Sequence, residues 1–327
     1  MERAPRFVFR CDAGPGSGAG HFMRQLAVAQ RAVKHGAATM LVPAQGEPLL
    51  AQLAPAIEGL LLPGLAPMEE AAWIRARFGS EAHVFVDSYQ LPIEYYAAFG
   101  ARCIAFEDGE RDLPAGLVVK PRPRLRPCKD PRVLEGTEYI PVREAFTAAP
   151  AATRSGGHLV ICFGASDPTG GTAEVLARLP AEPPPGWRVT VVRGPLHREV
   201  ALPSLPHWHV EVVVSPDMPT LLGSADAAIV AAGSIVWELA VLGVPTMAFS
   251  VVDNQDRNAN WLRETGCIAG GWRLGSQPLT EHTDVSTFLA DAAWRETLSE
   301  ALHEQIDGLG AERIVAAALA HPTGVPT

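Results

Sequence analysis

Short apolar segments alternate with amphipathic segments along most of the chain. β-Branched and aliphatic residues gather in runs bounded by Gly, Pro and polar residues, and several segments between these runs carry apolar residues at helical spacing. Strands that alternate with helices predict parallel sheets covered by helices on both faces. The first half predicts helices at His21–Lys34 and Met68–Phe78, and strands at Phe7–Cys11, Thr39–Val42, Gly59–Leu62, His83–Asp87, Cys103–Phe106 and Leu117–Lys120.

The second half repeats this alternation. A doubled pattern of strands and helices predicts an α/β fold of two Rossmann-like domains that face each other across a cleft. The hydrophobic residues, 47% of the 327, suffice to bury a core in each domain. The predicted strands are His158–Phe163, Arg188–Val192, Val210–Val214, Ala227–Val230 and Thr246–Phe249, and the predicted helices are Gly171–Arg178, Met218–Ser224, Ser234–Leu242 and Asn254–Glu264.

A stretch rich in Ala, Pro, Ser and Gly at Ala148–Gly157 is predicted to link the two domains. The predicted domains are therefore residues 1–150 and 151–327. Upstream of the linker, proline and arginine nearly alternate. We interpret the basic cluster there as a solvated loop in preference to a phosphate contact; it consists of Arg122, Arg124 and Arg126.

The charge and the cysteines limit the function class. A formal net charge of -9 argues against a general binder of nucleic acid or anionic membranes, although it leaves an anionic small ligand possible. The five cysteines are scattered and form no C-x-x-C pair, which is typical of reduced thiols in the cytoplasm. No signal peptide or membrane-spanning run is evident, so we expect a cytoplasmic protein without stable membrane insertion.

A glycine-rich loop follows the first predicted strand. Glycines allow positive φ and close approach of a ligand to the main chain, and the next helix begins with unpaired N–H groups. A plain tight turn explains the same glycines equally well. The spacing departs from the dinucleotide fingerprint, which disfavours a nicotinamide cofactor. These glycines are Gly14, Gly16, Gly18 and Gly20.

His21 opens the predicted helix after this loop, at the mouth of a parallel sheet, where α/β proteins bind ligands. A neutral imidazole there can take a proton from water, and the helix start helps to keep it uncharged. The alternative is an ordinary surface histidine. Asp87 and Tyr89 end another strand at the same edge, where the phenol can support the attacking water; a capping Asp and a packed Tyr are the alternative.

Two loops of the second half are further candidates. In Phe163–Thr172, Ser166, Asp167 and Thr172 either cap a helix or close over a diphosphate, and capping is the commoner use of such residues.

The more informative loop is Ala231–Gln255. Amides at Gly233 and Ser234 can meet phosphate, and the Glu238 carboxylate can accept two hydrogen bonds from a ribose. Asn254 and Gln255 open the following helix and place amide side chains over the predicted cleft. Glu238 is otherwise a first-turn residue favoured by the helix dipole.

Several motifs are absent from the sequence. There is no zinc spacing of Cys and His, no G-x-S-x-G elbow and no P-loop. The sequence therefore predicts chemistry without a metal or a redox cofactor.

In order and spacing, the motifs together resemble the hydrolase family that acts on UDP-2,4-diacetamido-2,4,6-trideoxy-β-L-altropyranose in pseudaminic acid biosynthesis. That family is related to the UDP-N-acetylglucosamine transferase that completes lipid II. The resemblance covers most of the chain. It rests on R-x-D-x5-G-x-G-H-x-x-R at Arg10–Arg24, V-D-S-Y at Val86–Tyr89, G-x-x-Y-x-x-x-R-E-x-F at Gly136–Phe146, F-G-x-S-D-P at Phe163–Pro168, and G-S-x-x-W-E to N-Q at Gly233–Gln255.

The resemblance implies a GT-B fold, with UDP held by the second domain and the sugar facing the first. It implies hydrolysis at the anomeric carbon with inversion, His21 activating water, and Asp12 and Tyr89 near that water. On the same basis the substrate site includes Arg10, Gly18, Gly20, Arg24, Gly164, Ser166, Asp167, Gly233, Ser234, Glu238, Asn254 and Gln255.

The chain departs from this family at two places. Members usually carry two aspartates and a downstream basic residue where this chain has Glu107–Asp108–Gly109, and an Asn-rich strand end where it has Lys120–Pro–Arg–Pro. Both lie on the predicted sugar side, so the sugar stays open. A glycosyltransferase that uses an acceptor, which an apolar patch on the first domain would favour, and a non-catalytic sugar-nucleotide-binding subunit remain alternatives. The run Leu60–Leu62 is interpreted as a buried strand instead of such a patch.

Overall fold

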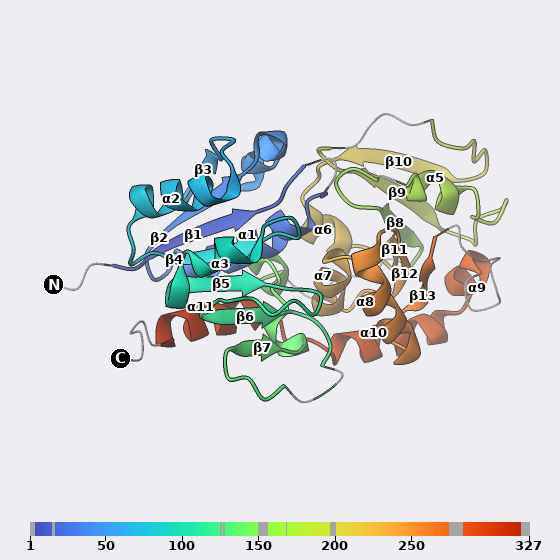
Figure 1. Cartoon of the computed structure of the whole chain (residues 1–327). Coiled ribbons are helices and arrows are strands. Elements are labelled where there is room, and N and C mark those ends of the chain that lie inside the picture. Colours follow the sequence, from blue (N-terminus) through green and yellow to red (C-terminus); the bar gives the residue numbers. More distant parts are fainter. Residues whose placement is uncertain are drawn as a thin grey trace. The chain divides into compact units, whose positions relative to one another are not determined.

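The computed structural model describes residues 4–14, 17–124, 126, 128–149, 156–167, 169–196, 201–274 and 284–321. The chain divides into two compact units, Met1–Glu144 with Gly308–Thr327, and Ala145–Asp307 (Figure 1). Most of the predicted linker, Pro150–Ser155, lies outside the described residues, as do Gly16 and Pro168 of the predicted loops.

The first unit is built on a seven-stranded parallel sheet in the order β3-β2-β1-β4-β5-β6-β7. The first six positions have the order typical of a Rossmann sheet, with a switch of direction between β1 and β4. The strands are β1 (Arg6–Cys11), β2 (Ala37–Val42), β3 (Ile57–Leu61), β4 (His83–Asp87), β5 (Cys103–Phe106), β6 (Leu117–Lys120) and β7 (Val133–Glu135).

Buried apolar side chains of strands and helices form a core in this unit, to which the strand residues Val8 and Val86 and the helix residue Ile74 contribute. Helices cover the faces because their apolar sides need the same burial. They are α1 (Gly20–Ala32), α2 (Pro67–Phe78), α3 (Ile93–Ala97) and α11 (Gly310–Ala320), with 3-10 turns η1 (Ala44–Gln52), η2 (Gly100–Arg102) and η3 (Thr137–Tyr139). The short helix α4 (Glu144–Thr147) contains the boundary between the two units.

The second unit repeats this topology. Its six parallel strands follow the order β10-β9-β8-β11-β12-β13, and the switch lies between β8 and β11. The strands are β8 (His158–Cys162), β9 (Arg188–Arg193), β10 (His209–Val214), β11 (Ala227–Ala231), β12 (Thr246–Ser250) and β13 (Ala269–Arg273), and the helices are α5 (Gly171–Leu176), α6 (Met218–Gly223), α7 (Ile235–Leu242), α8 (Asp253–Glu264), α9 (Val285–Ala290) and α10 (Ala292–His303).

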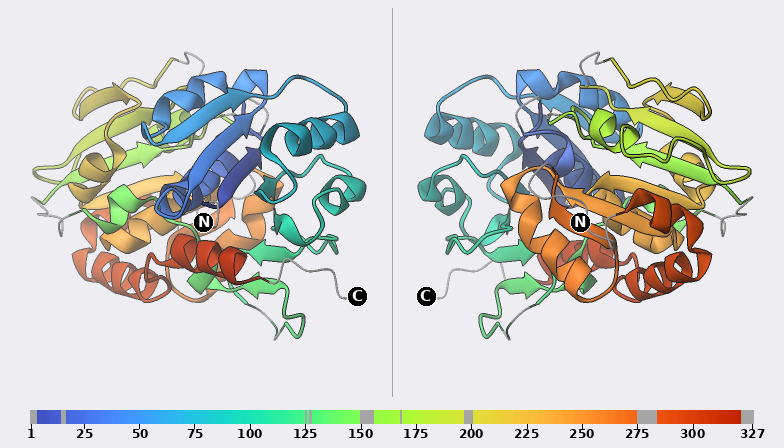
Figure 2. Two further views of the ribbon diagram at one scale, coloured as in Figure 1. Left: turned by 90° about the vertical axis from the view of Figure 1, so that its left-hand side faces the viewer. Right: turned by 90° about the vertical axis from the view of Figure 1, so that its right-hand side faces the viewer.

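The predicted strands and helices are all present, with bounds that differ by at most two residues. The C-terminal helix α11 belongs to the first unit, where it contacts α1 and η3 (Figure 2), although the sequence placed all of 151–327 in the second domain. The interpretation of Leu60–Leu62 as a buried strand is wrong for Leu61, which is 39% exposed. β3 is an edge strand, and Leu61 projects away from the core.

Candidate active site

The candidate site of the first unit lies where the topology changes direction. β1 and β4 are neighbours, and their last residues, Cys11 and Asp87, are paired in register. Helix α1 begins at Gly20, so His21 stands in its first turn. The carboxyl ends of parallel strands at a switch point are the usual place for a ligand in such sheets.

His21 forms a close pair with Asp87. Its Nδ1 atom lies 2.5 Å from Oδ1 of Asp87. A carboxylate accepts but does not donate, so Nδ1 carries the proton and Nε2 presents its lone pair. Among the described residues none bonds to Nε2. This tautomer is the one that a general base requires.

Asp87 is completely buried. Burial raises the pKa of its carboxyl, but the guanidinium of Arg24 and the ring of His21 outweigh this effect and hold the pKa well below its usual range. Asp87 is therefore an anion at neutral pH. A fixed anion behind Nδ1 orients the ring and stabilises the imidazolium that forms when Nε2 takes a proton.

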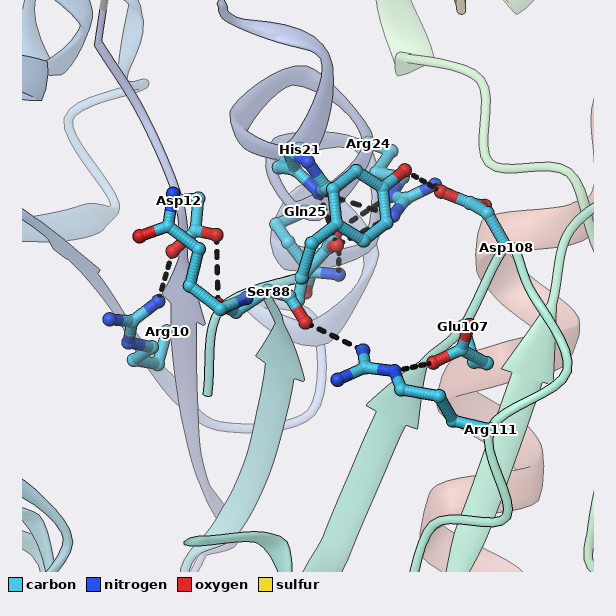
Figure 3. A network of polar contacts seen from close by, with 12 residues as sticks. Arg10, Asp12, His21, Arg24, Gln25, Ser88, Glu107, Asp108 and Arg111 are labelled. Atoms are coloured by element: carbon cyan, nitrogen blue, oxygen red, sulfur yellow. Dashed lines mark hydrogen bonds and ion pairs between the residues drawn. The ribbon is translucent and has the colours of Figure 1, made fainter. Parts of the chain in front are cut away.

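Arg24 joins two carboxylates. Its Nε and Nη2 atoms donate to Asp87, with Nη2 2.6 Å from Oδ1, while Nη1 donates to Asp108 at 2.7 and 2.9 Å. Gln25 adds a bond of 3.2 Å to Asp87 from the next position of α1. Figure 3 shows Arg24 between His21 and Asp108. The role of Arg24 seen here is to hold these acids in place.

Tyr89 donates its phenol proton to Asp108. Its ring meets that of His21 edge-on, with centroids 4.5 Å apart, and the residue is 41% exposed. An exposed aromatic ring beside a buried imidazole offers an apolar wall at the site. The structure therefore brings the predicted residues His21, Arg24 and Tyr89 together.

Asp12 stands apart from His21. It accepts from Arg10 at 2.5 Å and from the hydroxyl of Ser88 at 2.8 Å, and Arg10 also reaches Glu70 at 2.9 Å. Asp12 and Arg10 thus fasten the end of β1 to the loop that carries Tyr89.

The glycine loop is closed by its own backbone. The amides and carbonyls of Gly14 and Gly18 bond reciprocally, at 3.1 and 2.7 Å. Both have positive φ, and a Cβ at Gly14 would lie 2.4 Å from Cγ of Gln45. At Gly18 and Gly20 a Cβ would meet nothing within 4 Å, so the loop surface is open there.

In the second unit, Asp167 acts on the helix that follows it. Its carboxylate accepts from the amides of Gly171 at 2.7 Å and Thr172 at 3.0 Å, as the capping alternative predicts. Gly164 has a φ of 84° and is exposed, and Ser166 is half-buried.

The loop after β11 leads into the start of helix α7. The amide of Gly233 donates a hydrogen bond to the carbonyl of Ala231. The amides of Ser234 and Ile235, in contrast, have no acceptor among the described residues. Gln255 lies over this turn: its Oε1 accepts from the amide of Val251 at 3.0 Å, and a Cβ on Gly233 would lie 3.4 Å from its Nε2. Amides at a helix start and a carboxamide donor suit an anion.

The other two predicted residues of this loop differ in exposure. Glu238 is buried in the first turn of α7, with 6% exposed. Asn254 is exposed at the start of α8.

The interpretation of the basic cluster as a solvated loop is wrong for Arg122. This residue is only 7% exposed and donates to the carbonyls of Asp108 at 2.6 Å and Gly109 at 2.9 Å. Arg124, nearly half exposed, bonds to Glu135 and Glu138.

The sequence named Asp87 as a strand-end residue beside Tyr89, with capping as the alternative, but neither Asp87 nor Asp108 was among the residues predicted to act in catalysis or substrate binding. For Asp87 the signal was its place at the end of a strand, on the edge of the sheet where His21 was expected. No comparable signal exists in the sequence for Asp108, because the Glu107–Asp108–Gly109 segment departs from the pattern of the hydrolase family that the motifs resemble.

The described residues lack two kinds of feature. No group of three His, Cys, Asp or Glu side chains there is placed to hold a metal ion, and no helix there has the length and apolar character to cross a membrane.

The chain was compared with protein-family models and with known proteins. No protein-family model matches the chain. The spore coat polysaccharide biosynthesis protein SpsG of Bacillus subtilis (strain 168) is 26% identical over 214 residues, which cover 62% of this chain and 62% of SpsG. The chain thus matches less than two thirds of that relative.

Solved structures resemble the whole chain at low identity. MurG of Acinetobacter baumannii is 14% identical with a TM-score of 0.62, covering 96% of this chain and 99% of MurG. CalG4, the calicheamicin glycosyltransferase, is 15% identical with a TM-score of 0.64 and 98% of both chains covered. LpCGTa in complex with UDP is 14% identical with a TM-score of 0.61, covering 99% of this chain and all of LpCGTa. These similarities and the two Rossmann-ordered sheets show that the chain has the GT-B fold.

Proposed function

We propose that the protein displaces UDP from the anomeric carbon of a UDP-linked amino sugar, with His21 as the general base. The observation that carries this proposal is the His21–Asp87 pair of 2.5 Å, which leaves Nε2 as a proton acceptor at the switch point of the sheet. A positioned base of this kind contributes about 10²–10⁴-fold to a rate.

In the proposed reaction an acceptor hydroxyl gives its proton to Nε2 of His21. Its oxygen attacks the anomeric carbon from the face opposite UDP, the bond from that carbon to the phosphate oxygen breaks, and the electron pair leaves with UDP. The configuration at the carbon is inverted. Asp87 stays ionised and stabilises the imidazolium.

For the nucleotide we propose the second unit. The amides of Ser234 and Ile235 and the carboxamide of Gln255 are donors for the diphosphate, and they stabilise the charge that grows on departing UDP. Glu238 is proposed for the ribose, with Asn254, Gly164 and Ser166 close to the substrate. One solved neighbour contains UDP, which supports this choice of nucleotide. Asp167 is proposed to act through the helix that it caps.

The proposal has two versions, which differ in the molecule that accepts the sugar. The names of the similar proteins, a glycosyltransferase and a polysaccharide biosynthesis protein, favour transfer to a saccharide hydroxyl, which is our first candidate. The ordered motifs from Arg10 to Gln255 favour the second, hydrolysis of a UDP-diacetamido-trideoxy or related amino sugar by water. The same base serves both, since each acceptor loses a proton from oxygen.

The test is to incubate the purified protein with a panel of UDP-amino sugars, with and without a panel of saccharide acceptors. Release of UDP that requires an acceptor, without free reducing sugar, supports transfer. Equal amounts of UDP and reducing sugar without an acceptor support hydrolysis. Failure to release UDP from any donor under either condition contradicts the proposal.

A further inference from the structure

The loop after β5 carries Asp108 and is held from behind by Arg122. The guanidinium of Arg122 donates to the carbonyls of Asp108 and Gly109, at 2.6 and 2.9 Å, and to the carboxylate of Glu135 at 3.0 Å. Arg122 is 7% exposed. A buried guanidinium with this many bonds fixes the backbone that presents the Asp108 side chain.

A second arginine ties the same loop to the residues around Tyr89. Arg111 donates to the carboxylate of Glu107 at 2.6 Å and to the carbonyl of Ser88 at 2.8 Å (Figure 3). The other oxygen of Glu107 accepts from the amide of Gly109 at 2.6 Å. The loop is thus connected to its neighbours on both sides of Asp108.

The Asp108 carboxylate faces the site and is ionised. Burial raises the pKa of its carboxyl, but Arg24 outweighs burial and the net pKa is lowered. It accepts two bonds from Arg24 and one from the phenol of Tyr89. Because an ionised carboxylate has no proton, Tyr89 must be the donor, and this bond fixes its ring beside His21.

The charges around His21 follow from these contacts. Helix α1 contributes Arg24 and the neutral Gln25, β4 and its loop contribute Asp87 and the neutral Ser88 and Tyr89, and the β5 loop contributes Asp108. On β1, Arg10 is paired with the carboxylates of Asp12 and Glu70. Two carboxylates, Asp87 and Asp108, therefore share one cation, Arg24.

We propose that Asp108 is a positioning residue of this site, which stabilises the protonated form of His21 through Arg24 and fixes Tyr89 against the His21 ring. The proposal rests on the proposed function, in which His21 is the base. With His21 neutral, the group of Arg24, Asp87 and Asp108 carries one net negative charge, and proton uptake by His21 neutralises it. Without Asp108, the same proton would leave a net positive charge in a largely buried place, so His21 would be a weaker base.

The test is the Asp108→Asn variant, which keeps the shape of the side chain and removes the charge. The pH titration of the His21 ring is followed by NMR in protein labelled at histidine, with His21→Gln to assign the signals. In Asp108→Asn we expect the midpoint of this titration to move to lower pH by about one unit. With a UDP-sugar that turns over, kcat should fall about tenfold, while the Kd for UDP stays unchanged.

The matched control is Asp112→Asn, which removes a carboxylate from the same loop where the side chain is 97% exposed. It should change neither the titration nor kcat. The signals of His83 and His158 report whether each unit of the variant remains folded. A His21 titration in Asp108→Asn that matches wild type, with those signals intact, overturns the proposal. Since the titration needs no turnover, this result is distinct from a failure of the proposed function, which would appear as no UDP release by wild type.

Discussion

The imidazole of His21 and the carboxylate of Asp87 lie 66 positions apart in the chain and 2.5 Å apart in space. One residue lies in the first turn of the helix after β1, and the other ends the neighbouring strand β4. The Rossmann order of the sheet makes these two places adjacent, and the ion pair with Arg24 keeps the acid ionised. The chemistry proposed for the protein depends on this relationship.

Replacing Asp87 by Asn should preserve the shape around His21 but remove the anion behind Nδ1. We expect kcat to fall by about two to four orders of magnitude, because the ring loses its fixed tautomer and the stabilisation of its imidazolium. The partly buried Arg24 also loses one of its two acids, so the free energy of unfolding should fall by about 3–5 kcal/mol. Steady-state kinetics and urea unfolding check both effects; unchanged kcat in the folded variant would argue against the role of Asp87.

Gly233→Ala probes the proposed diphosphate site without disturbing the fold. The added Cβ would lie 3.4 Å from Nε2 of Gln255, an ordinary contact, and the position does not have positive φ. We expect an unchanged Tm and a weaker affinity for UDP, by about tenfold, because the methyl group occupies the approach to the Ser234 amide. Titration calorimetry with UDP measures the effect.

The control for this variant is Gly223→Ala, at a glycine of the same unit whose Cβ would meet nothing within 4 Å. It should leave UDP binding as in wild type. Equal UDP affinity in the two variants would remove Gly233 from the proposed site.

His83 predicts a pH dependence of stability that is independent of the active site. Its Nε2 accepts from Arg102 at 2.9 Å, and its ring stacks on Phe7. Burial, helped by Arg102, lowers the pKa of His83 to about 4. Between about pH 4 and the ordinary value near 6.5, the unfolded chain therefore binds a proton that the folded chain does not.

Above about pH 6.5, His83 should therefore make no pH-dependent contribution to the free energy of unfolding. As the pH drops from there to about 4, the free energy of unfolding should fall by up to about 3 kcal/mol. Denaturant unfolding at a series of pH values measures the slope. His83→Gln, which can still accept from Arg102, should flatten it, whereas the change to Gln at the exposed His207 should not. A slope that His83→Gln leaves intact would assign the effect to other groups.

The pattern of the sequence predicted most of the secondary structure because apolar runs and helical spacing are local properties. β4, β5 and β6 begin and end at the predicted residues. The short strand β7, with half-buried residues only, and β13, which contains Gly270 and Gly271, lack that apolar signal and were missed. Helix α11 is separated from its own sheet by the whole second unit, so chain order assigned it to the wrong neighbours.

The site was predictable in part. A histidine at the start of a helix after β1 follows from the sequence, because the glycine loop and the strand before it are local. The choice of Asp87 as its partner, and of Asp108 as the partner of Arg24 across 84 positions, depends on how the strand ends pair and on loops that arginines such as Arg122 hold in place. No periodicity encodes those contacts.

The most direct measurement of the central claim is turnover by His21→Gln, with wild type and the surface variant His207→Gln beside it. The UDP-sugar that wild type consumes is the substrate, UDP release is the readout, and the Kd for UDP is measured on the same samples. The account predicts that kcat falls by about 10²–10⁴-fold in His21→Gln alone while its Kd for UDP stays that of wild type. A His21→Gln enzyme that releases UDP at the wild-type rate would contradict it.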